Sequence, residues 1–318
     1  MPINYEKGVL PENYIPNTYE SLGNMIGKIA EQKITTVDAT NKLAIFSKKL
    51  PMNGDTIEQV VIKLSNSTAY DPEGAGALTR QNPSLAVRMF KTWNRRKFKA
   101  TRDIALMTKV LQEGKGSGTL AAGIVAELYP SDEQEHYENI KDLLMYSRQE
   151  TDGGKGESRN SLVNIATVDY NNGIDYKEIL VQLKDAVSGM KFVNADFNTA
   201  GIKRATKEKD IVIIMPYKIK NKIDINELAG VFNLEKAEIG NHIHEVDIPA
   251  NENGEYFIFV LDQNCVLDYT RLYDMVDQKN ADGYFWNYFL HVERLFAISQ
   301  LFDGGYIKVK TKAPAING

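Results

Sequence analysis

The chain has 318 residues, of which 43% are hydrophobic, and a formal net charge of -4. This hydrophobic content excludes wholesale disorder, and the small net charge argues against a dedicated nucleic-acid binder. The one cysteine, Cys265, excludes an internal disulfide, which suits a reducing cytoplasm, and we expect a buried hydrophobe there rather than a nucleophile. The sequence contains no apolar run of about 18 residues and no signal-peptide pattern, so it predicts neither a membrane span nor export.

Prolines interrupt the beginning of the chain. Pro2, Pro11 and Pro16 forbid a regular helix there and favour an extended arm. A short amphipathic helix is expected to follow from Thr18. Because such an arm has little to fold against alone, we expect residues 1–42 to lie on another subunit.

The pattern becomes strand-like between residues 43 and 90. Residues 57–64 and 86–90 are predicted to be the two sides of a long excursion, and the polar, glycine-rich residues 71–76 are its tip. An isolated two-stranded ribbon is only marginally stable in water, so something must cover it.

One stretch of the chain concentrates positive charge and aromatic residues without any acid. Its basic side chains are Arg88, Lys91, Arg95, Arg96, Lys97, Lys99 and Arg102. Interleaved aromatics make a single-stranded nucleic-acid platform one interpretation. The preferred interpretation is a subunit interface with an acidic stretch further along the chain. That stretch contains Asp132, Glu133, Glu135, Glu138 and Asp142.

Residues 120–148 show the clearest helical pattern, which we expect to be interrupted at Pro130. Ser131 and the three residues after it have the spacing of a capping box that restarts the helix, with Ile140 and Leu144 facing inward. Residues 114–119 and 153–158 combine glycines with a lysine, but both lack the GxxxxGK[ST] signature of a phosphate loop and are predicted to be surface loops.

The following region alternates one helix with short strands. The pattern predicts an amphipathic helix over 174–190, a buried strand over 211–215 that ends at Pro216, and a short helix over 226–231. Edge-like strands are expected over 243–248 and 256–261. Together these elements predict a compact α+β unit.

Residues 283–310 form the densest aromatic and apolar segment. Its spacing fits one face of a helix, but it also alternates as a strand through Trp286, Tyr288, Leu290 and Val292. Aromatic and β-branched residues favour the strand. We expect the glycines after Asp303 to make a turn, so that this strand and residues 306–310 form a hairpin.

Motifs for chemistry are lacking. His242 and His244 could be two metal ligands on one side of a strand, but no third ligand stands at a matched spacing, and exposed strand residues are the preferred interpretation. No nucleophile elbow, zincin motif or dinucleotide fingerprint occurs. The sequence predicts no catalytic residues, no cofactor and no metal.

Several segments resemble, in the right order, the major capsid proteins of small short-tailed phages with protein-primed genomes. The matching segments are INELAGVFNL at 225–234, FIFVLD at 257–262, and GYFWNY at 283–288 followed by His291 and Val292. The resemblance implies the Hong Kong 97-type shell fold, an α+β fold. It also implies a division into an N-terminal arm (1–42), an extended loop (43–90), a peripheral domain with a spine helix (91–171), an axial domain (172–265) and a return to the peripheral domain (266–318).

The function implied by this resemblance is structural rather than enzymatic. The chain would assemble with itself, as pentamers and hexamers, into an icosahedral head around packaged double-stranded DNA bound without sequence specificity. The resemblance also implies assembly in the host cytoplasm and a location in the virion. It implies a separate scaffolding protein and a portal as partners, and no association with a membrane. Two alternatives are an encapsulin-like shell and a single-stranded nucleic-acid-binding module.

Two departures from relatives lead to further expectations. Some relatives carry an immunoglobulin-like module after the final strand, whereas only residues 311–318 follow Lys310 here, so we expect a smooth shell. Some members of the wider fold carry a long N-terminal scaffolding segment that is cut away. The arm at 1–42 is short for that role, so we expect it to persist in mature particles.

Overall fold

The computed structural model describes residues 39–50, 54–67, 69–70, 72, 74, 80, 82–103, 123, 125–148, 161–169, 176–223 and 242–310. The predicted arm up to residue 38, most of the tip at 71–76, both glycine-rich segments and the predicted helix at 226–231 lie outside these described residues.

The described residues divide into two compact units. The first unit holds those within 1–40, 95–134 and 273–292, and the second holds those within 41–94, 135–272 and 293–318. Four of the five boundaries between the units fall inside continuous elements. These are β4 (Asn94–Asp103), α4 (Leu128–Tyr146), β9 (Val266–Asn280) and β10 (Phe285–Ile298).

A five-stranded sheet dominates the second unit, with strand order β5-β11-β8-β6-β7. Its strands are β5 (Val163–Asp169), β6 (Ile211–Pro216), β7 (Ile243–Val246), β8 (Glu255–Asp262) and β11 (Gly304–Lys310). β8 runs antiparallel to both neighbours, β11 and β6, whereas the outer pairs β5/β11 and β6/β7 are parallel. The short elements η2 (Glu208–Asp210) and α6 (Tyr217–Lys220) flank β6.

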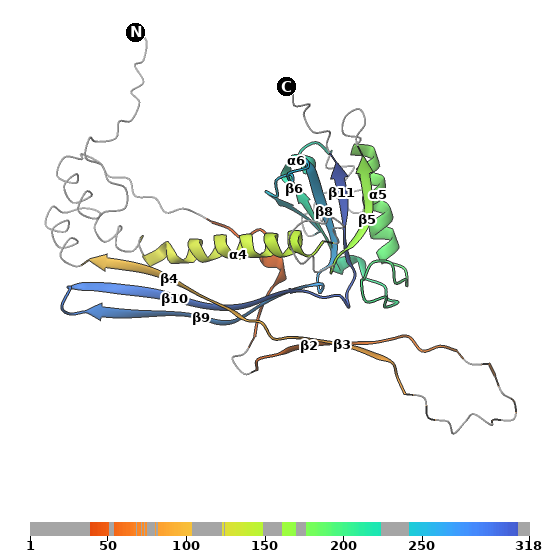
Figure 1. Cartoon of the computed structure of the whole chain (residues 1–318), viewed down its shortest axis with the longest axis horizontal. Coiled ribbons are helices and arrows are strands. Elements are labelled where there is room, and N and C mark those ends of the chain that lie inside the picture. Colours follow the sequence, from red (N-terminus) through yellow and green to blue (C-terminus); the bar gives the residue numbers. More distant parts are fainter. Residues whose placement is uncertain are drawn as a thin grey trace, which may run out of the picture. The chain divides into compact units, whose positions relative to one another are not determined.

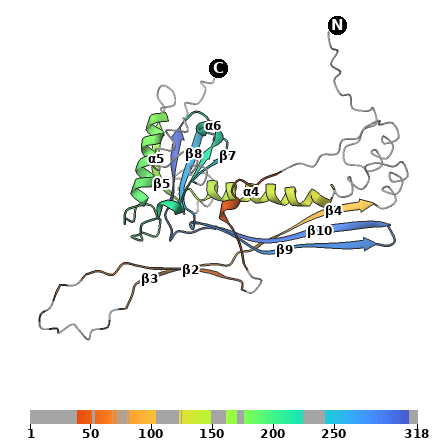
Figure 2. The same cartoon turned by 180° about the vertical axis from the view of Figure 1, so that it is seen from behind.

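Apolar side chains cover both faces of this sheet. Ile211, Ile213 and Met215 of β6 lie in one core, on the side covered by α5 (Tyr176–Met190), as Figures 1 and 2 show. Val212 and Ile214 alternate into the opposite core. Because successive side chains of a strand point to opposite faces, a strand buried on both faces is a continuous apolar run. The predicted strand at 211–215 and the predicted helix at 174–190 are therefore confirmed.

The opposite core also receives the C-terminal part of α4. Ile140 and Leu144, both fully buried, pack with Leu43 and Phe46 from the segment containing η1 (Ala44–Phe46). After η1, β1 (Ser47–Lys49) pairs in parallel with β9. The inward side of the predicted helix at 120–148 is thus confirmed, and among the described residues no helix has the length and apolar character needed to cross a membrane.

The predicted position of the interruption is wrong, because residues 125–126 are helical, Glu127 forms a turn, and α4 begins at Leu128, before Pro130. Pro130 lies in the first turn of the continuous helix α4, where its missing N–H costs little. The capping box is wrong as well, because the Ser131 hydroxyl donates backwards to the Glu127 carbonyl (2.7 Å) instead of capping the following turn.

The hairpin expected at the end of the chain is also wrong. β10 is indeed a strand, but its neighbours are β9 and β4 in a four-stranded sheet of order β1-β9-β10-β4, whereas β11 belongs to the five-stranded sheet. β9 and β10 form the actual hairpin across residues 281–284, where the Asn280 side-chain oxygen accepts two backbone N–H groups. Gly304 and Gly305 lie inside β11. A Cβ on Gly305 would come within 2.6 Å of the Val163 carbonyl, so close strand packing explains this glycine.

Two other differences concern strands. The predicted edge strand at 256–261 is β8, which lies centrally in its sheet and has Phe257, Phe259 and Leu261 fully buried. The strand β9 was not foreseen.

In the first unit, Leu290 and Val292 of β10 pack with Ala100 of β4 and Leu128 of α4 in a small core of their own.

Candidate subunit interface

The predicted excursion is a two-stranded hairpin formed by β2 (Ile57–Ile62) and β3 (Leu85–Phe90), which within the described part of the chain pair only with each other (Figure 1). In this antiparallel register Val60 stands opposite Val87, and Ile62 stands opposite Leu85. Directly opposed residues share a face, so we define an outer face by the apolar residues Val60, Ile62, Leu85, Val87 and Met89. The predicted strands at 57–64 and 86–90 are confirmed.

The outer face is uncovered. Ile62 is 71% exposed and Val60 51%, and on the partner strand Met89 is 59% exposed. Ordinary surface residues of this kind occur singly, whereas here they form one continuous strip. A contiguous exposed apolar strip indicates a surface that another molecule covers.

The opposite face of the hairpin contacts its own chain. Gln59 and Arg88 are directly paired across the strands on this face. The Arg88 Nη2 atom donates to Gln300 Oε1 at 2.6 Å, and Gln59 Nε2 reaches the Asn264 carbonyl at 3.5 Å. These contacts hold the face that carries Gln59 and Arg88 against loops of the second unit and leave the outer face exposed.

A cluster around Arg271 holds the base of the hairpin, and we call it the Arg271 clamp. The guanidinium donates to both carboxylate oxygens of Glu293 (2.9 and 2.6 Å) and to Asp55 Oδ1 (2.5 Å), which lies just before β2. It also stacks on Trp93, just after β3, at 4.6 Å from the ring centroid. Hydrogen bonds to Glu293 raise the pKa of Arg271 above its ordinary value, so its guanidinium keeps its positive charge. Bidentate and stacked geometry of this kind is specific to arginine.

The basic run divides between β3, the following loop and β4. Arg88 belongs to the hairpin, and Lys91 is exposed in the loop. Arg95, Arg96, Lys97 and Lys99 are exposed along β4, an outer strand of the four-stranded sheet. The ammonium groups of Lys97 and Lys99 both lie over the Phe289 ring, 5.6 and 5.7 Å from its centroid. Phe98, between them, packs into the core of the first unit.

The predicted acidic residues occupy α4 but differ in accessibility. Asp132 is only 1% exposed, so its carboxylate cannot meet a neighbouring subunit without rearrangement. Glu133, Glu135 and Glu138 are partly exposed. Glu138 already pairs with Lys141 one turn away, with 2.7 Å between the carboxylate and the ammonium.

The residues that could be reactive lie in environments that favour a structural role. Cys265 is fully buried, as expected, and burial raises the pKa of its thiol well above its usual range. The Nδ1 atom of His242 lies 3.0 Å from the Ile211 carbonyl, and that contact uses one ligand position of this imidazole. Within the described ranges, no group of three or more histidine, cysteine or carboxylate side chains is arranged to hold a metal.

Sequence reasoning missed a buried polar cluster formed by Ser47, His136 and Asp268. His136 Nε2 lies 2.8 Å from Asp268 Oδ2, and the Ser47 hydroxyl donates to the same oxygen at 2.5 Å. In a catalytic triad the carboxylate and the hydroxyl meet different nitrogens of the imidazole, whereas here both approach Nε2. His136 and Asp268 are also 3% and 0% exposed, so the cluster fastens β1 to β9 and α4 rather than performing catalysis. No local spacing could have signalled it, because its members come from three distant segments.

Known structures share this architecture. The capsid structure of Staphylococcus phage Andhra matches with a TM-score of 0.71 at 15% identity, over 90% of this chain and 88% of that chain. A chain in the structure of head fiber and inner core protein gp22 of native bacteriophage P68 matches with a TM-score of 0.64, also at 15% identity, over 88% and 87%. The chain therefore has the Hong Kong 97-type fold of phage capsid proteins, and the predicted fold class is confirmed.

Sequence comparison then gives the family. The chain belongs to the Phi29-like phage major capsid protein family, whose family model matches residues 10–307. The major capsid protein of Bacillus phage GA-1 is 26% identical over 304 residues, which cover 93% of this chain and 61% of that protein. The chain spans between 61% and 67% of the length of the curated Bacillus phage relatives that it matches.

Proposed function

We propose that this chain is a structural subunit that assembles with copies of itself, as pentamers and hexamers, into the icosahedral head shell of a tailed phage. The observation that carries the proposal is the uncovered apolar outer face of the β2–β3 hairpin, held outward by contacts on its opposite face and by the Arg271 clamp. Within a shell of identical subunits, a neighbouring copy would cover this face.

The energetics favour a many-contact assembly over a tight pair. Burying one aliphatic side chain completely gives about 1.5–3 kcal/mol, so the half-exposed residues of the outer face give roughly 6 kcal/mol together. Association costs about 4–15 kcal/mol in lost freedom, which leaves little net affinity for one contact. Repetition of weak contacts in a closed symmetric shell makes the whole stable while misplaced subunits can still leave.

The sheets support a revised domain division. We propose that the β2–β3 hairpin is the extended loop, that α4 with β9, β10 and β4 forms the peripheral domain, and that the five-stranded sheet with α5 forms the axial domain. The sequence-based division placed residues 266–318 with the peripheral domain. The pairing of β11 with β8 and β5 supports moving that strand to the axial domain.

The basic run remains part of the proposal. Arg95, Arg96, Lys97 and Lys99 would face carboxylates of a neighbouring subunit, with Glu133, Glu135 and Glu138 as the accessible acidic candidates. A separate scaffolding protein, a portal and packaged double-stranded DNA are further proposed partners, and the virion is the proposed location. The family match favours neither the encapsulin-like shell nor the single-stranded nucleic-acid module.

Electron microscopy and sedimentation of the expressed chain, alone and together with the other head proteins of its phage, test the proposal. We expect closed particles from the unsubstituted chain and none from Ile62→Asp, whose charge lies on the outer face. Ser84→Asp places the same charge at an exposed site before β3 on the opposite face, and it should assemble normally. Normal particles from Ile62→Asp would remove the observation on which the proposal rests.

A further inference from the structure

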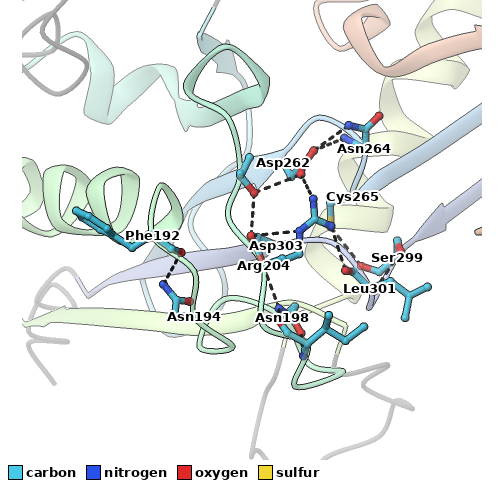
Figure 3. Close-up of polar contacts among 12 residues, drawn as sticks. Phe192, Asn194, Asn198, Arg204, Asp262, Asn264, Cys265, Ser299, Leu301 and Asp303 are labelled. Atoms are coloured by element: carbon cyan, nitrogen blue, oxygen red, sulfur yellow. Dashed lines mark hydrogen bonds and ion pairs between the residues drawn. The ribbon is translucent and has the colours of Figure 1, made fainter. Parts of the chain in front are cut away.

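The loop after α5 is unusually well ordered by polar contacts, as Figure 3 shows. The Asn194 side chain donates to the Gly189 carbonyl at the end of α5 (2.8 Å) and to the Phe192 carbonyl (3.2 Å). Asn194 and Arg204 also exchange both backbone hydrogen bonds, at 3.1 and 2.9 Å. The two ends of the loop are therefore fastened to each other and to the helix.

Arg204 anchors the loop to the five-stranded sheet. Its Nη2 atom lies 2.8 Å from Asp262 Oδ2, and its Nη1 atom donates to the Leu301 carbonyl at 3.1 Å (Figure 3). Its guanidinium also stacks on Phe302. Asp303 accepts hydrogen bonds from Asn198 (3.0 Å) and Thr206 (2.8 Å). Because Asp262 and Asp303 are almost fully buried, the loop cannot move without leaving their charges unpaired inside the protein.

This fixed loop presents two adjacent apolar side chains to solvent, which we call the apolar knob. Phe192 is 71% exposed and Val193 is 58% exposed. In the same loop, Phe197 packs so closely on Gly189 of α5 that a Cβ on this glycine would lie 2.7 Å from the Phe197 ring. A large aromatic side chain held on an ordered support is the usual form of an interface anchor, because little conformational freedom is lost on binding.

We infer that the apolar knob of one copy docks on the outer face of the β2–β3 hairpin of the next copy. This inference rests on the proposed function and specifies one of its contacts. The two surfaces are uncovered apolar features of the same chain, one made of two adjacent residues and the other extending along two strands. The charges are also complementary. The loop that carries the knob has three exposed lysines, Lys203, Lys207 and Lys209, against one exposed carboxylate, Asp196, whereas the outer face carries Glu58 beside its apolar residues.

The size of the surfaces favours this pairing over contact between two knobs. A phenylalanine buries on the order of 150–250 Å² when fully covered, far below the roughly 1,600 Å² of a stable two-body interface. Contact between two knobs would bury too little surface area. The outer face runs along both strands, so it offers a knob more area than a second knob does. A contact between different surfaces is head-to-tail and, repeated around an axis, closes a ring.

Engineered cysteines test the contact directly, because the natural Cys265 is fully buried and stays silent. After mild oxidation of assembled particles, Val193→Cys combined with Val87→Cys should give ladders of linked subunits. Two matched pairs should stay unlinked: Val193→Cys with Ser84→Cys, which lies on the other hairpin face, and Thr199→Cys with Val87→Cys, which moves the loop cysteine away from the knob. Ladders from a control pair but not from the first pair, or dimers linked only through Val193→Cys, would overturn the inference.

A second measurement covers the case in which the cysteine pairs disturb assembly. Phe192→Ser should lower particle yield at least several-fold without changing the melting temperature of the free subunit, and Phe192→Leu should restore the yield. Full yield from Phe192→Ser would overturn the docking contact while leaving shell formation intact. Failure of the unsubstituted chain to form particles would instead contradict the proposed function itself.

Discussion

The five-stranded sheet and the β2–β3 hairpin use similar residues in opposite ways. Strands β6, β8 and β11 place alternate side chains into two cores, so their apolar residues are buried within one chain. The hairpin alternates equally well, but one face carries polar contacts to its own chain and the other carries exposed aliphatic residues. The difference shows that an alternating pattern of apolar residues defines a strand face that must be buried, and that another molecule can bury it.

The largest expected effect on the free subunit is in the sheet. Phe259→Ala removes a fully buried ring from the centre of β8 and should lower the free energy of unfolding by about 3–5 kcal/mol. Ile62→Ala, its counterpart in the hairpin, should stay within about 0.5 kcal/mol, because Ile62 is 71% exposed. Urea denaturation of the unassembled subunit measures both. Equal losses would contradict the distinction between the two regions.

A smaller, pH-dependent effect is expected at the start of β8. Glu255 accepts from Lys308 (2.9 Å) and Asn251 (2.7 Å). Burial alone would raise the pKa of Glu255, but these hydrogen bonds outweigh it and lower the pKa below its ordinary value of 4.5. A carboxyl with a lowered folded-state pKa stabilises the fold above its unfolded pKa, and this contribution disappears as the pH falls through the folded value.

Glu255→Gln should therefore cost about 2 kcal/mol at pH 7, and the difference from the unsubstituted chain should shrink as the pH falls below the ordinary carboxyl pKa of 4.5. Chemical denaturation at several pH values measures this change. Glu252→Gln, on an exposed residue of the same turn, is the matched control and should show neither effect. A cost independent of pH would show that the carboxylate charge is not responsible.

The Arg271 clamp predicts a local effect confined to the hairpin. Arg271→Gln should speed amide hydrogen exchange in β2 and β3 several-fold while exchange in β6 and β8 stays unchanged. The clamp joins residues before β2 and after β3, so its loss frees the base of the hairpin without opening a core. Lys279→Gln, an exposed change on the same strand β9, should leave the hairpin protected. Uniformly faster exchange would mean that Arg271 supports the whole fold.

The smallest expected effect on the free subunit comes from the basic run. Reversing Arg95→Glu and Arg96→Glu on exposed β4 should change the free energy of unfolding by no more than about 0.5 kcal/mol. Particle yield should nevertheless fall, because like charges would oppose each other at every symmetric contact. The double reversal Lys218→Glu, Lys222→Glu is the control. Normal empty shells with defective DNA-filled particles would instead assign the run to nucleic acid.

Local patterns predicted the elements better than their neighbours. The strand at Phe285–Ile298, the fully buried strand β6 and the helix α5 all follow from apolar periodicity, and the structure confirms them. The candidate interface stays a prediction. Charge density located the basic run, but the burial of Asp132 depends on packing, which no local pattern reports.

The sequence by itself determined which faces of the strands are apolar, because side-chain direction alternates with a period of two whatever lies beside the strand. It also determined the family, through ordered matches along most of the chain. Only the tertiary structure decided that β10 pairs with β9 rather than β11. It also showed that Gly305 is required by the close approach of the Val163 backbone and not by a turn. Strand pairing and side-chain contacts join residues that are far apart in the chain. The alternation of apolar and polar residues within one strand does not specify which other strand lies beside it.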